Sequence, residues 1–385
     1  MGRFFYQCQR MLGLVCALLL CEMPEAAMAQ KAQAPDQRPR ILYYNSATPE
    51  DHWWHTTSEI MQAACDDLGL ELEVVYVNRN HIGMLEHFES VINGSLRPDA
   101  VVFQSLKKNG VGMLKLAEQG KIPAFMFNAG LTAEQTRSHG GPRERFKYWI
   151  GQMLPDDQAA GHDLALTLYR EALSRGLVDH AGKVQFLAIN GAVADGAAIE
   201  RAAGLQLAMQ QEPGIALQQL TSANWQREQG KLVFLGLSRR YPQAKAVWAA
   251  NDPMGLGALD GMLERGLVPG KDMLVGSIDW VPEALHEVAN NRLVTTQGGH
   301  FMEAGWVMVL LHDYFKQRDF ASEAVSFKTK MTALSQRDSA AYLRAFTPEN
   351  FHKINFRQFS KAENPALQQY NFSFAPVLAD LLDQE

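Results

Sequence analysis

Short polar side chains and tryptophans recur where the apolar segments of this sequence end. Asp51 follows the first such segment together with the pair Trp53–Trp54, and Asn251 follows a later one. Carboxylates accept hydrogen bonds, amides both accept and donate them, and indole rings offer flat apolar faces. This combination suits a sugar or another polyol, whose C–H faces stack on rings while its hydroxyls need donors and acceptors. The candidate ligand-binding residues are Asp51, Trp53, Trp54, Asn128, Asp195, Trp225, Asn251, Asp279 and Gln297.

These side chains can meet only if the apolar segments are neighbouring strands. Short β-rich runs alternate with longer helical patterns, and runs such as Ala100–Phe103 are apolar throughout, which is typical of strands covered by helices on both faces. Ligands of open α/β sheets bind beyond the carboxyl ends of the strands, where the candidate residues stand. The sequence therefore predicts a doubly wound α/β fold. The expected strands are 41–45, 72–77, 100–104, 123–128, 148–152, 184–190, 216–220, 246–251, 273–278 and 293–297.

Ten strands exceed what one open sheet holds comfortably, and the polar stretch 132–147 interrupts their rhythm. We therefore expect two lobes of similar size, each a parallel sheet, joined by a hinge of three segments. Residues 335–385 lose the rhythm, so we expect a tail that packs on the lobes. The expected lobes are an N-terminal one of residues 41–152 plus 298–324 and a C-terminal one of residues 153–297 plus 325–334.

The N-terminal segment is typical of an exported protein. It opens with arginines, residues 11–20 are apolar or glycine, and Ala27 and Ala29 offer small side chains where a signal peptidase cleaves. Spanning a bilayer as a helix takes roughly 20 apolar residues, so the shorter run predicts a signal peptide and not a membrane anchor. We expect residues 1–29 to be removed by cleavage before Gln30, with residues 30–40 as a linker.

Cysteine use agrees with export. Cys8, Cys16 and Cys21 lie in the expected signal peptide, which leaves Cys65 alone and predicts no internal disulfide. Cys65 stands in an apolar helical stretch and is expected to be a small buried side chain. Cys21 leaves a lipid-anchored form open, although the bulky Leu20 before it fits lipoprotein processing poorly.

Charge and motif content exclude several classes of function. The formal net charge is -6 and no run of lysines and arginines is present, which argues against a nucleic-acid partner. The chain contains no Gly-x-Ser-x-Gly nucleophile elbow, and Gly191, Gly196 and their surroundings do not form a dinucleotide-binding pattern. His52 and His55 with Asp51 have only loose metal-ligand spacing. We therefore expect no catalysis, no metal and no cofactor.

The segment Val247–Leu259 carries the most specific signal. Its Asn251-Asp252-Pro253 joins an apolar strand to a helix, and proline is favoured at the first helical position. The segment resembles the strand, Asn-Asp pair and helix of periplasmic sugar-binding proteins of the ribose- and galactose-binding type, and more loosely of the autoinducer-binding protein in that superfamily. The resemblance covers roughly residues 39–331. It implies a type I periplasmic binding fold in which Asn251 binds the ligand and Asp252 caps the helix.

Other positions match that family less evenly. Asp51 and Trp53–Trp54 resemble its polar residue and aromatic pair after the first strand, and Trp225 resembles the aromatic of the opposite lobe, so the rings would sandwich the ligand. Glu200–Gly204 resembles the helix start where the family often places a ligand-binding arginine just ahead. Ala198–Ile199 stands there instead.

Further departures argue against ribose as the ligand. Asn128 stands where an aspartate is frequent, and Ala129 replaces its usual arginine neighbour. The segment Gly276–Asp279 is one residue longer than the common Gly-x-Asp. Of the tryptophan pair, Trp54 is favoured for the ligand and its neighbour for the core. Helix caps or helix starts would by themselves explain Asp156, Asp157, Asp195, Asp252, His300 and Glu303.

The resemblance implies a monomeric periplasmic protein that captures a sugar or sugar-like molecule between its lobes and delivers it to the membrane permease of an ABC-type importer. An alternative is a subunit that presents its ligand to a membrane sensor, such as a histidine kinase or a cyclase. The linker and the tail around residues 346–374 keep this alternative open. In either case closure of the lobes would be the signal that the partner reads.

Overall fold

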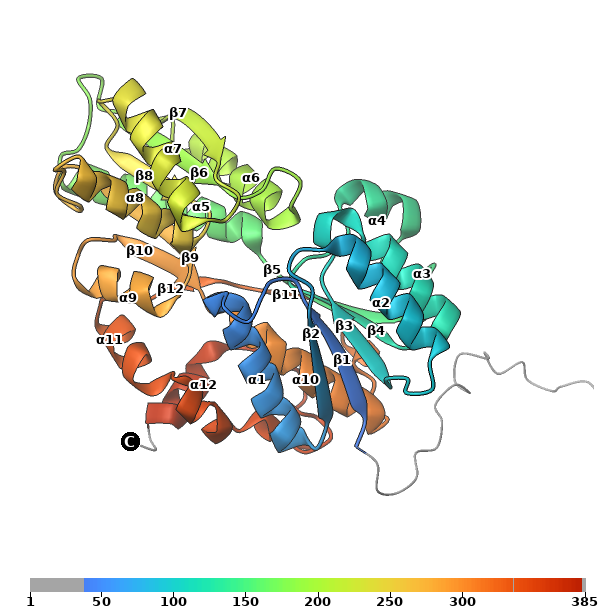
Figure 1. Ribbon diagram of the computed structural model, residues 1–385. Coiled ribbons are helices and arrows are strands. Elements are labelled where there is room, and N and C mark those ends of the chain that lie inside the picture. Colours follow the sequence, from blue (N-terminus) through green and yellow to red (C-terminus); the bar gives the residue numbers. More distant parts are fainter. Residues whose placement is uncertain (1–37, 335, 383–385) are drawn as a thin grey trace, which may run out of the picture. The chain divides into compact units, whose positions relative to one another are not determined.

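The computed structural model describes residues 38–334 and 336–382. The expected signal peptide, the cleavage site before Gln30, Cys21 and most of the expected linker lie outside these residues. The described chain contains two six-stranded sheets with interleaved helices (Figure 1), which confirms the predicted doubly wound α/β class. Within residues 38–334 and 336–382, we find no helix with the length and apolar character that a membrane crossing needs.

The first sheet is parallel throughout, in the order β11-β5-β4-β3-β1-β2. Strand β1 lies between β2 and β3, so that Ile41 is opposite Leu72 of β2 on one side and Ala100 of β3 on the other. All residues of β3 and β4 are buried, because apolar side chains occupy both faces. The strands are β1 (Arg40–Asn45), β2 (Glu71–Tyr76), β3 (Ala100–Phe103), β4 (Ala124–Phe127), β5 (Trp149–Pro155) and β11 (Ser326–Thr329).

Helices cover both faces of this sheet. They are α1 (His52–Leu68), α2 (His81–Asn93), α3 (Gly110–Gly120) and α10 (Glu303–Phe315), whereas the short α4 (Ala133–His139) has no buried residue. Alternate residues of β1 enter two separate hydrophobic clusters: Ile41 and Tyr43 join the one that contains residues of α1 and α10, whereas Leu42 and Tyr44 join the one that contains residues of α2 and α3. Successive strand residues point to opposite faces, so both faces need apolar cover.

The second sheet has the order β12-β10-β9-β8-β6-β7 and is parallel except at β12. Helices α5 and α6 pack closely at Gly161, where a Cβ would overlap the backbone of Arg201. The strands are β6 (Val184–Asn190), β7 (Ile215–Ser222), β8 (Ala246–Ala249), β9 (Leu274–Asp279), β10 (Thr295–Gly298) and β12 (Thr332–Ala333). The helices are α5 (Asp157–Ser174), α6 (Gly196–Gln211), α7 (Arg227–Arg240), α8 (Asp252–Glu264) and α9 (Pro282–Ala289).

All the strands expected from the sequence are present, as β1 to β10, with small shifts at their ends. Two short strands, β11 and β12, were not expected, because their sequences SFKT and TA carry no apolar run. In the described residues the chain passes from one sheet to the other after β5, after β10 and between β11 and β12. The last passage therefore lies at residues 330–331, later than the expected boundary at residue 325.

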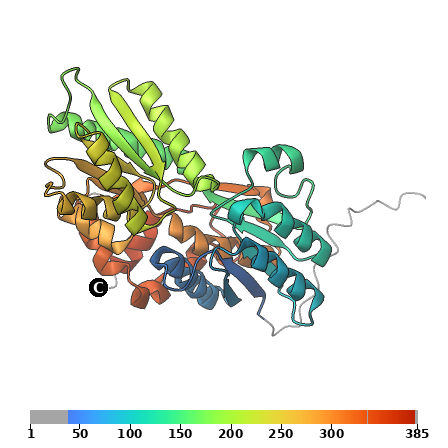
Figure 2. The ribbon, with the colours of Figure 1, turned by 45° about the horizontal axis from the view of Figure 1, so that its top comes forward.

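The C-terminal residues pack on elements of both sheets. Helix α11 contacts α9, whereas η5 and η6 contact α1, and Figures 1 and 2 both show this red segment beside the blue α1. Three carboxylates anchor it. Asp313 accepts from the Lys361 amide at 2.7 Å and the Tyr370 hydroxyl at 2.8 Å, Asp67 accepts from the Phe356 amide at 2.9 Å, and Glu323 accepts from the Tyr370 amide at 3.1 Å. The elements are α11 (Gln336–Ala345), η5 (Pro348–Lys353), η6 (Phe356–Phe359) and α12 (Phe374–Leu382).

Candidate functional site

A pocket lies beyond the carboxyl ends of strands from both sheets. It encloses about 860 Å³ of space, including its opening to solvent. Its lining includes every candidate ligand-binding residue except Gln297. Gln297 is instead buried in β10, opposite Ile278 of β9 and Ala333 of β12. Residues at the carboxyl end of β9 or after β1, β4, β6, β7 and β8 thus meet around one space, as the strand-end rule predicts.

The start of α1 forms one wall of the pocket. Asp51 is the N-cap residue, and its Oδ1 accepts from the Trp54 amide at 3.2 Å. This bond fixes the first helical turn, which carries Trp53 and Trp54 as half-buried rings with centroids 4.7 Å apart and planes at 82°. Both rings line the pocket, whereas Trp54 was expected to face the ligand and Trp53 to pack in the core.

Trp225 lies across the carboxyl end of the second sheet and is held on several sides. Its Nε1 donates to Asp195 Oδ2 at 2.8 Å, and the Arg201 guanidinium lies 5.8 Å from its ring centroid. Asp195 occupies the N-cap position of α6 but makes no capping bond, because its carboxylate serves the indole instead. A Cβ at Gly191 would overlap the six-membered ring of Trp225. The position of the indole therefore depends on a residue without a side chain.

Replacing Gly191 should weaken ligand binding through Trp225. In Gly191→Ala the new methyl group displaces the indole from its bond with Asp195, so we expect about a tenfold rise in Kd, or roughly 1.4 kcal/mol. Isothermal titration with a bound sugar measures the change. Gly236→Ala is the matched control, because a Cβ there meets nothing within 4 Å. Equal affinities for both variants would show that the indole's position does not matter.

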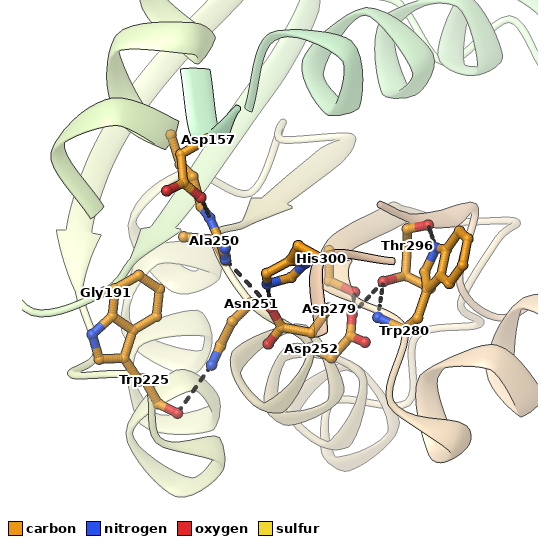
Figure 3. A network of polar contacts seen from close by, with 12 residues as sticks. Asp157, Gly191, Trp225, Ala250, Asn251, Asp252, Asp279, Trp280, Thr296 and His300 are labelled. Atoms are coloured by element: carbon orange, nitrogen blue, oxygen red, sulfur yellow. Dashed lines mark hydrogen bonds and ion pairs between the residues drawn. The ribbon is translucent and has the colours of Figure 1, made fainter. Parts of the chain in front are cut away.

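The residue that caps α8 in the Asn251–Asp252 pair is Asn251 and not Asp252, contrary to expectation. Asn251 is the N-cap of α8: its Oδ1 accepts from the Met254 amide at 3.0 Å, and its Nδ2 donates to the Trp225 carbonyl at 3.3 Å (Figure 3). Asp252 is fully buried and accepts from Thr296 Oγ1 at 2.6 Å and the Val281 amide at 2.8 Å. The predicted cap role of Asp252 is therefore wrong, because the capping residue precedes the first helical residue and has extended backbone.

Asp252 links the end of β8 to β9 and β10. Burial raises its pKa to about 6, although the hydroxyls of Ser277 and Thr296 and the amide of Val281 act in the opposite direction. Such a carboxyl is held by its donors because an unpaired one would be costly in this interior. Asp252 thus supports the strand ends that carry Asn251 and Asp279 without lining the pocket itself.

Arg201 is a pocket residue that sequence reasoning missed. The family's arginine was expected just ahead of Glu200, but Arg201 reaches the pocket from within α6. It is 4% exposed and donates from Nε to Asp157 Oδ1 at 2.7 Å and from Nη1 to the Ala250 carbonyl at 2.6 Å. Burial alone would lower the pKa of Arg201, but Asp157 and the other nearby carboxylate, Asp279, raise it overall. A single arginine in the Ala-rich segment 197–204 was the available signal.

The same network corrects one of the expected caps. Asp156 is the N-cap of α5 and accepts from the Ala159 amide at 3.1 Å, as predicted. Asp157 is not a cap, because it is a buried first-turn residue whose carboxylate pairs with Arg201. Burial raises the pKa of Asp157, and the guanidinium opposes that shift.

Asp279 and Gln104 add buried polar groups to the pocket. Burial raises the pKa of Asp279 well above its ordinary value, while Arg201 Nη1, at 3.4 Å from Oδ1, opposes the shift. Gln104 was not among the candidates; its Nε2 donates to the Tyr43 hydroxyl at 3.1 Å, and its Oε1 is buried without a partner. It directly follows β3, so the strand-end rule could have found it.

His300 also lines the pocket. As expected, it stands with Glu303 at a helix start, because His300 begins the short helix η3 (His300–Met302) and Glu303 begins α10; the two side chains do not bond each other, and Glu303 Oε1 accepts from Thr329. His300 is 2% exposed, and its Nε2 lies 3.7 Å from Asp279 Oδ1. Burial lowers its pKa well below the ordinary value, with a further contribution from Arg201. The imidazole is therefore neutral at physiological pH.

Backbone in the left-handed region gathers at this pocket. Asn128 has φ 62°, Trp225 φ 67° and Asp279 φ 142°, although none of them is glycine. Such conformations cost roughly 1–3 kcal/mol each and persist where surrounding structure holds them, often at functional sites. The strain accompanies side chains that the pocket uses, which favours a binding role over a purely structural one.

The lining can bind a small hydroxylated molecule. It offers indole faces on two sides, carboxylate and amide acceptors between them, and the guanidinium of Arg201. Among residues 38–334 and 336–382, no group of three or more His, Cys, Asp or Glu side chains is placed to hold a metal ion.

The chain is similar to known sugar-binding proteins. It is 23% identical over 270 residues to the galactofuranose-binding protein YtfQ of Escherichia coli, covering 69% of this chain and 78% of the relative. It is 23% identical over 290 residues to the ribose import binding protein RbsB of Salmonella typhimurium, covering 75% and 86%. A crystal structure of a periplasmic sugar-binding protein from Pseudomonas fluorescens has a TM-score of 0.80 at 29% identity, covering 88% and 99%.

The fold and these relatives agree with a family match. The fold is that of type I periplasmic binding proteins, as the resemblance implies. The relatives are binding proteins and not enzymes, in line with the sequence analysis. The periplasmic binding protein domain is matched at residues 41–313, a range that includes every candidate ligand-binding residue and most of both sheets. The chain therefore belongs to the periplasmic binding protein domain family.

Proposed function

We propose that this protein binds a sugar or sugar-like molecule in the periplasm and delivers it to an ABC-type importer. The observation that carries the proposal is the pocket in which Trp53 and Trp54 face the same space as Trp225, Asp279 and Asn251. Stacking rings with carboxylate and amide groups between them match the two kinds of surface on a sugar. The similarity to galactofuranose- and ribose-binding proteins supports the same ligand class.

The pocket's division between two sheets suggests how binding becomes a signal. We propose that each sheet with its helices is a lobe and that the passages after β5, after β10 and between β11 and β12 form the hinge. A ligand that contacts residues of both lobes binds the closed arrangement more tightly than the open one, and it therefore shifts the population toward the closed arrangement. A tenfold preference corresponds to about 1.4 kcal/mol, so one or two hydroxyl contacts to charged groups shift the population strongly.

The route to the periplasm follows from the N-terminal sequence. We propose that residues 1–29 are removed as a signal peptide and that the mature chain begins at Gln30. The family is periplasmic, which agrees with export. We also propose that the mature protein acts as a monomer.

A ligand screen tests the proposed function. The purified mature chain is heated with D-ribose, L-arabinose, D-galactose, D-fructose or xylitol at millimolar concentration. We expect at least one to raise the unfolding temperature, because a ligand at 100 times its Kd adds about 2.7 kcal/mol to stability. The sugar must be recovered unchanged, since turnover would indicate an enzyme. A panel without any shift would contradict the proposal.

A second candidate function is presentation of the ligand to a membrane sensor, and one observation favours it. Trp280 directly follows the pocket residue Asp279, and its ring packs on Tyr342 and Phe374 of the C-terminal segment, with centroids 5.6 and 5.5 Å away. Movement at the pocket could thus reach an additional surface. Deleting the gene distinguishes the functions: loss of sugar uptake supports the importer, whereas normal uptake with loss of a sugar-induced transcriptional response supports the sensor.

A further inference from the structure

A glycine pair delivers His300 to the pocket. Gly299 has φ 97°, in the region that favours glycine, and a Cβ at Gly298 would overlap the indole of Trp280. The chain therefore turns sharply at the end of β10 and enters a short helix that begins at His300. Because Gln297 stays inside the sheet, His300 is the first residue after β10 that lines the pocket.

The ring of His300 is supported but its polar atoms are incompletely satisfied. Its centroid lies 4.8 Å from the Trp53 ring with planes at 32°, so the two rings nearly stack. Nε2 faces Asp279 Oδ1 at 3.7 Å, beyond a good hydrogen bond, and Nδ1 is buried without a partner. Figure 3 shows the imidazole beside Asp279. The indole Nε1 of Trp53 is likewise buried without a partner.

An unsatisfied buried polar atom costs roughly 1–3 kcal/mol, so its presence needs an explanation. A structural partner within the helix start is not the explanation, because Glu303 bonds Thr329 instead. The neutral ring carries one N–H and one lone pair. The carboxylate of Asp279 favours the proton on Nε2, which leaves Nδ1 as an acceptor.

We propose that His300 is a specificity-determining residue of the pocket, whose Nδ1 accepts a hydrogen bond from one hydroxyl of the ligand while Trp53 supports its ring. The proposal rests on the sugar-binding function proposed above. It adds a chemical requirement: the ligand must present an O–H donor at the wall formed by these two rings. A sugar without that hydroxyl leaves Nδ1 unpaired and loses affinity.

The variant His300→Phe separates ligand recognition from folding. Phenylalanine keeps a flat ring against Trp53 but has no polar atom, so the ligand-free protein should unfold at the same temperature as wild type or a higher one. Its Kd for the tightest sugar of the screen should rise at least tenfold, measured by isothermal titration. His300→Asn, whose Oδ1 can replace Nδ1 as acceptor, should recover part of the affinity.

His312→Phe is the matched control, because His312 is equally buried on α10 but its Nε2 lies 3.0 Å from Glu363 Oε1, outside the pocket. This variant should lose stability and keep the wild-type Kd. Monodeoxy analogues of the same sugar identify the hydroxyl that bonds Nδ1. The analogue that lacks this hydroxyl should have the same Kd for wild type and for His300→Phe.

The outcomes separate the two proposals. If wild type binds a sugar and His300→Phe binds it with the same Kd, the role of His300 is wrong and the sugar-binding function stands. The rise in Kd from wild type to His300→Phe is compared between the parent sugar and each monodeoxy analogue. If this rise is the same for all of them, the assigned hydroxyl contact is wrong. If His300→Phe does not fold, a wild-type Kd for His300→Ala overturns the proposal and a tenfold loss supports it. If wild type binds no sugar of the panel, both proposals fail.

Discussion

Trp225→Ala should remove most of the affinity for a sugar while leaving the fold intact. The half-buried indole faces the pocket, so a ligand that covers about 100 Å² of it gains roughly 2.5 kcal/mol at 25 cal/mol per Å². The substitution also releases Asp195 from the indole Nε1, which disturbs a second lining residue. We expect Kd to rise about 100-fold in isothermal titration.

The control for this result is Trp225→Phe. Phenylalanine keeps an aromatic face but cannot donate to Asp195, so its affinity should lie between those of wild type and Trp225→Ala. Circular dichroism and thermal unfolding without ligand should show a folded protein in both cases. An unchanged Kd for Trp225→Ala would mean that the ligand does not use this pocket wall.

Arg201→Ala should produce the largest loss of stability of any single change at the pocket. The guanidinium neutralises Asp157 and faces Asp279, and all three side chains are buried. Removing one partner of a buried ion pair leaves uncompensated charge, which typically costs 3–5 kcal/mol. Urea unfolding at pH 8 should therefore show a fall in the free energy of unfolding of about that size, together with loss of sugar binding.

This loss should depend on pH in a defined direction. Burial already raises the pKa values of Asp157 and Asp279, and Arg201 opposes both shifts, so its removal raises them further. Carboxyls with raised folded-state pKa values favour folding at low pH and lose that contribution as pH rises through those values. The difference in stability between wild type and Arg201→Ala should therefore be smaller at pH 5 than at pH 8.

Two further variants make the explanation specific. Adding Asp157→Asn to Arg201→Ala should recover part of the stability, because one of the stranded carboxylates is then gone. Arg227→Ala is the matched control: Arg227 pairs with Asp260 and Glu283, but its side chain is 41% exposed and not buried, so its removal should cost no more than about 1 kcal/mol. If Arg201→Ala costs no more than Arg227→Ala, the buried network is not a stabilising unit.

The positions of ten strands along the chain and the place of the pocket could be predicted from local sequence. Apolar runs such as Ala100–Phe103 are strands buried on both faces, and a buried parallel strand needs helices on either side. Once the strands are known, the residues at their carboxyl ends are fixed by chain connectivity. For this reason Asn128, Trp225, Asn251 and Asp279 were identified as neighbours although they are far apart in sequence.

Side-chain roles at those strand ends depended on partners that the sequence does not reveal locally. Asn251 caps α8 and Asp252 turns inward because hydroxyls of Ser277 and Thr296 lie there to receive it. Without those partners, either residue could have capped the helix. Gln297 was selected by the same strand-end rule, yet its side chain remains in the sheet.

The sequence by itself determined the class of fold, the two sets of strands and eight of the residues around the pocket, because burial periodicity and strand ends are local properties. The tertiary structure decided which further polar groups enter the pocket. Arg201 reaches it because Gly161 allows α5 and α6 to approach closely, and His300 reaches it because Gly298 and Gly299 turn against Trp280. Such placements depend on contacts between segments distant in the chain, and no local pattern specifies them.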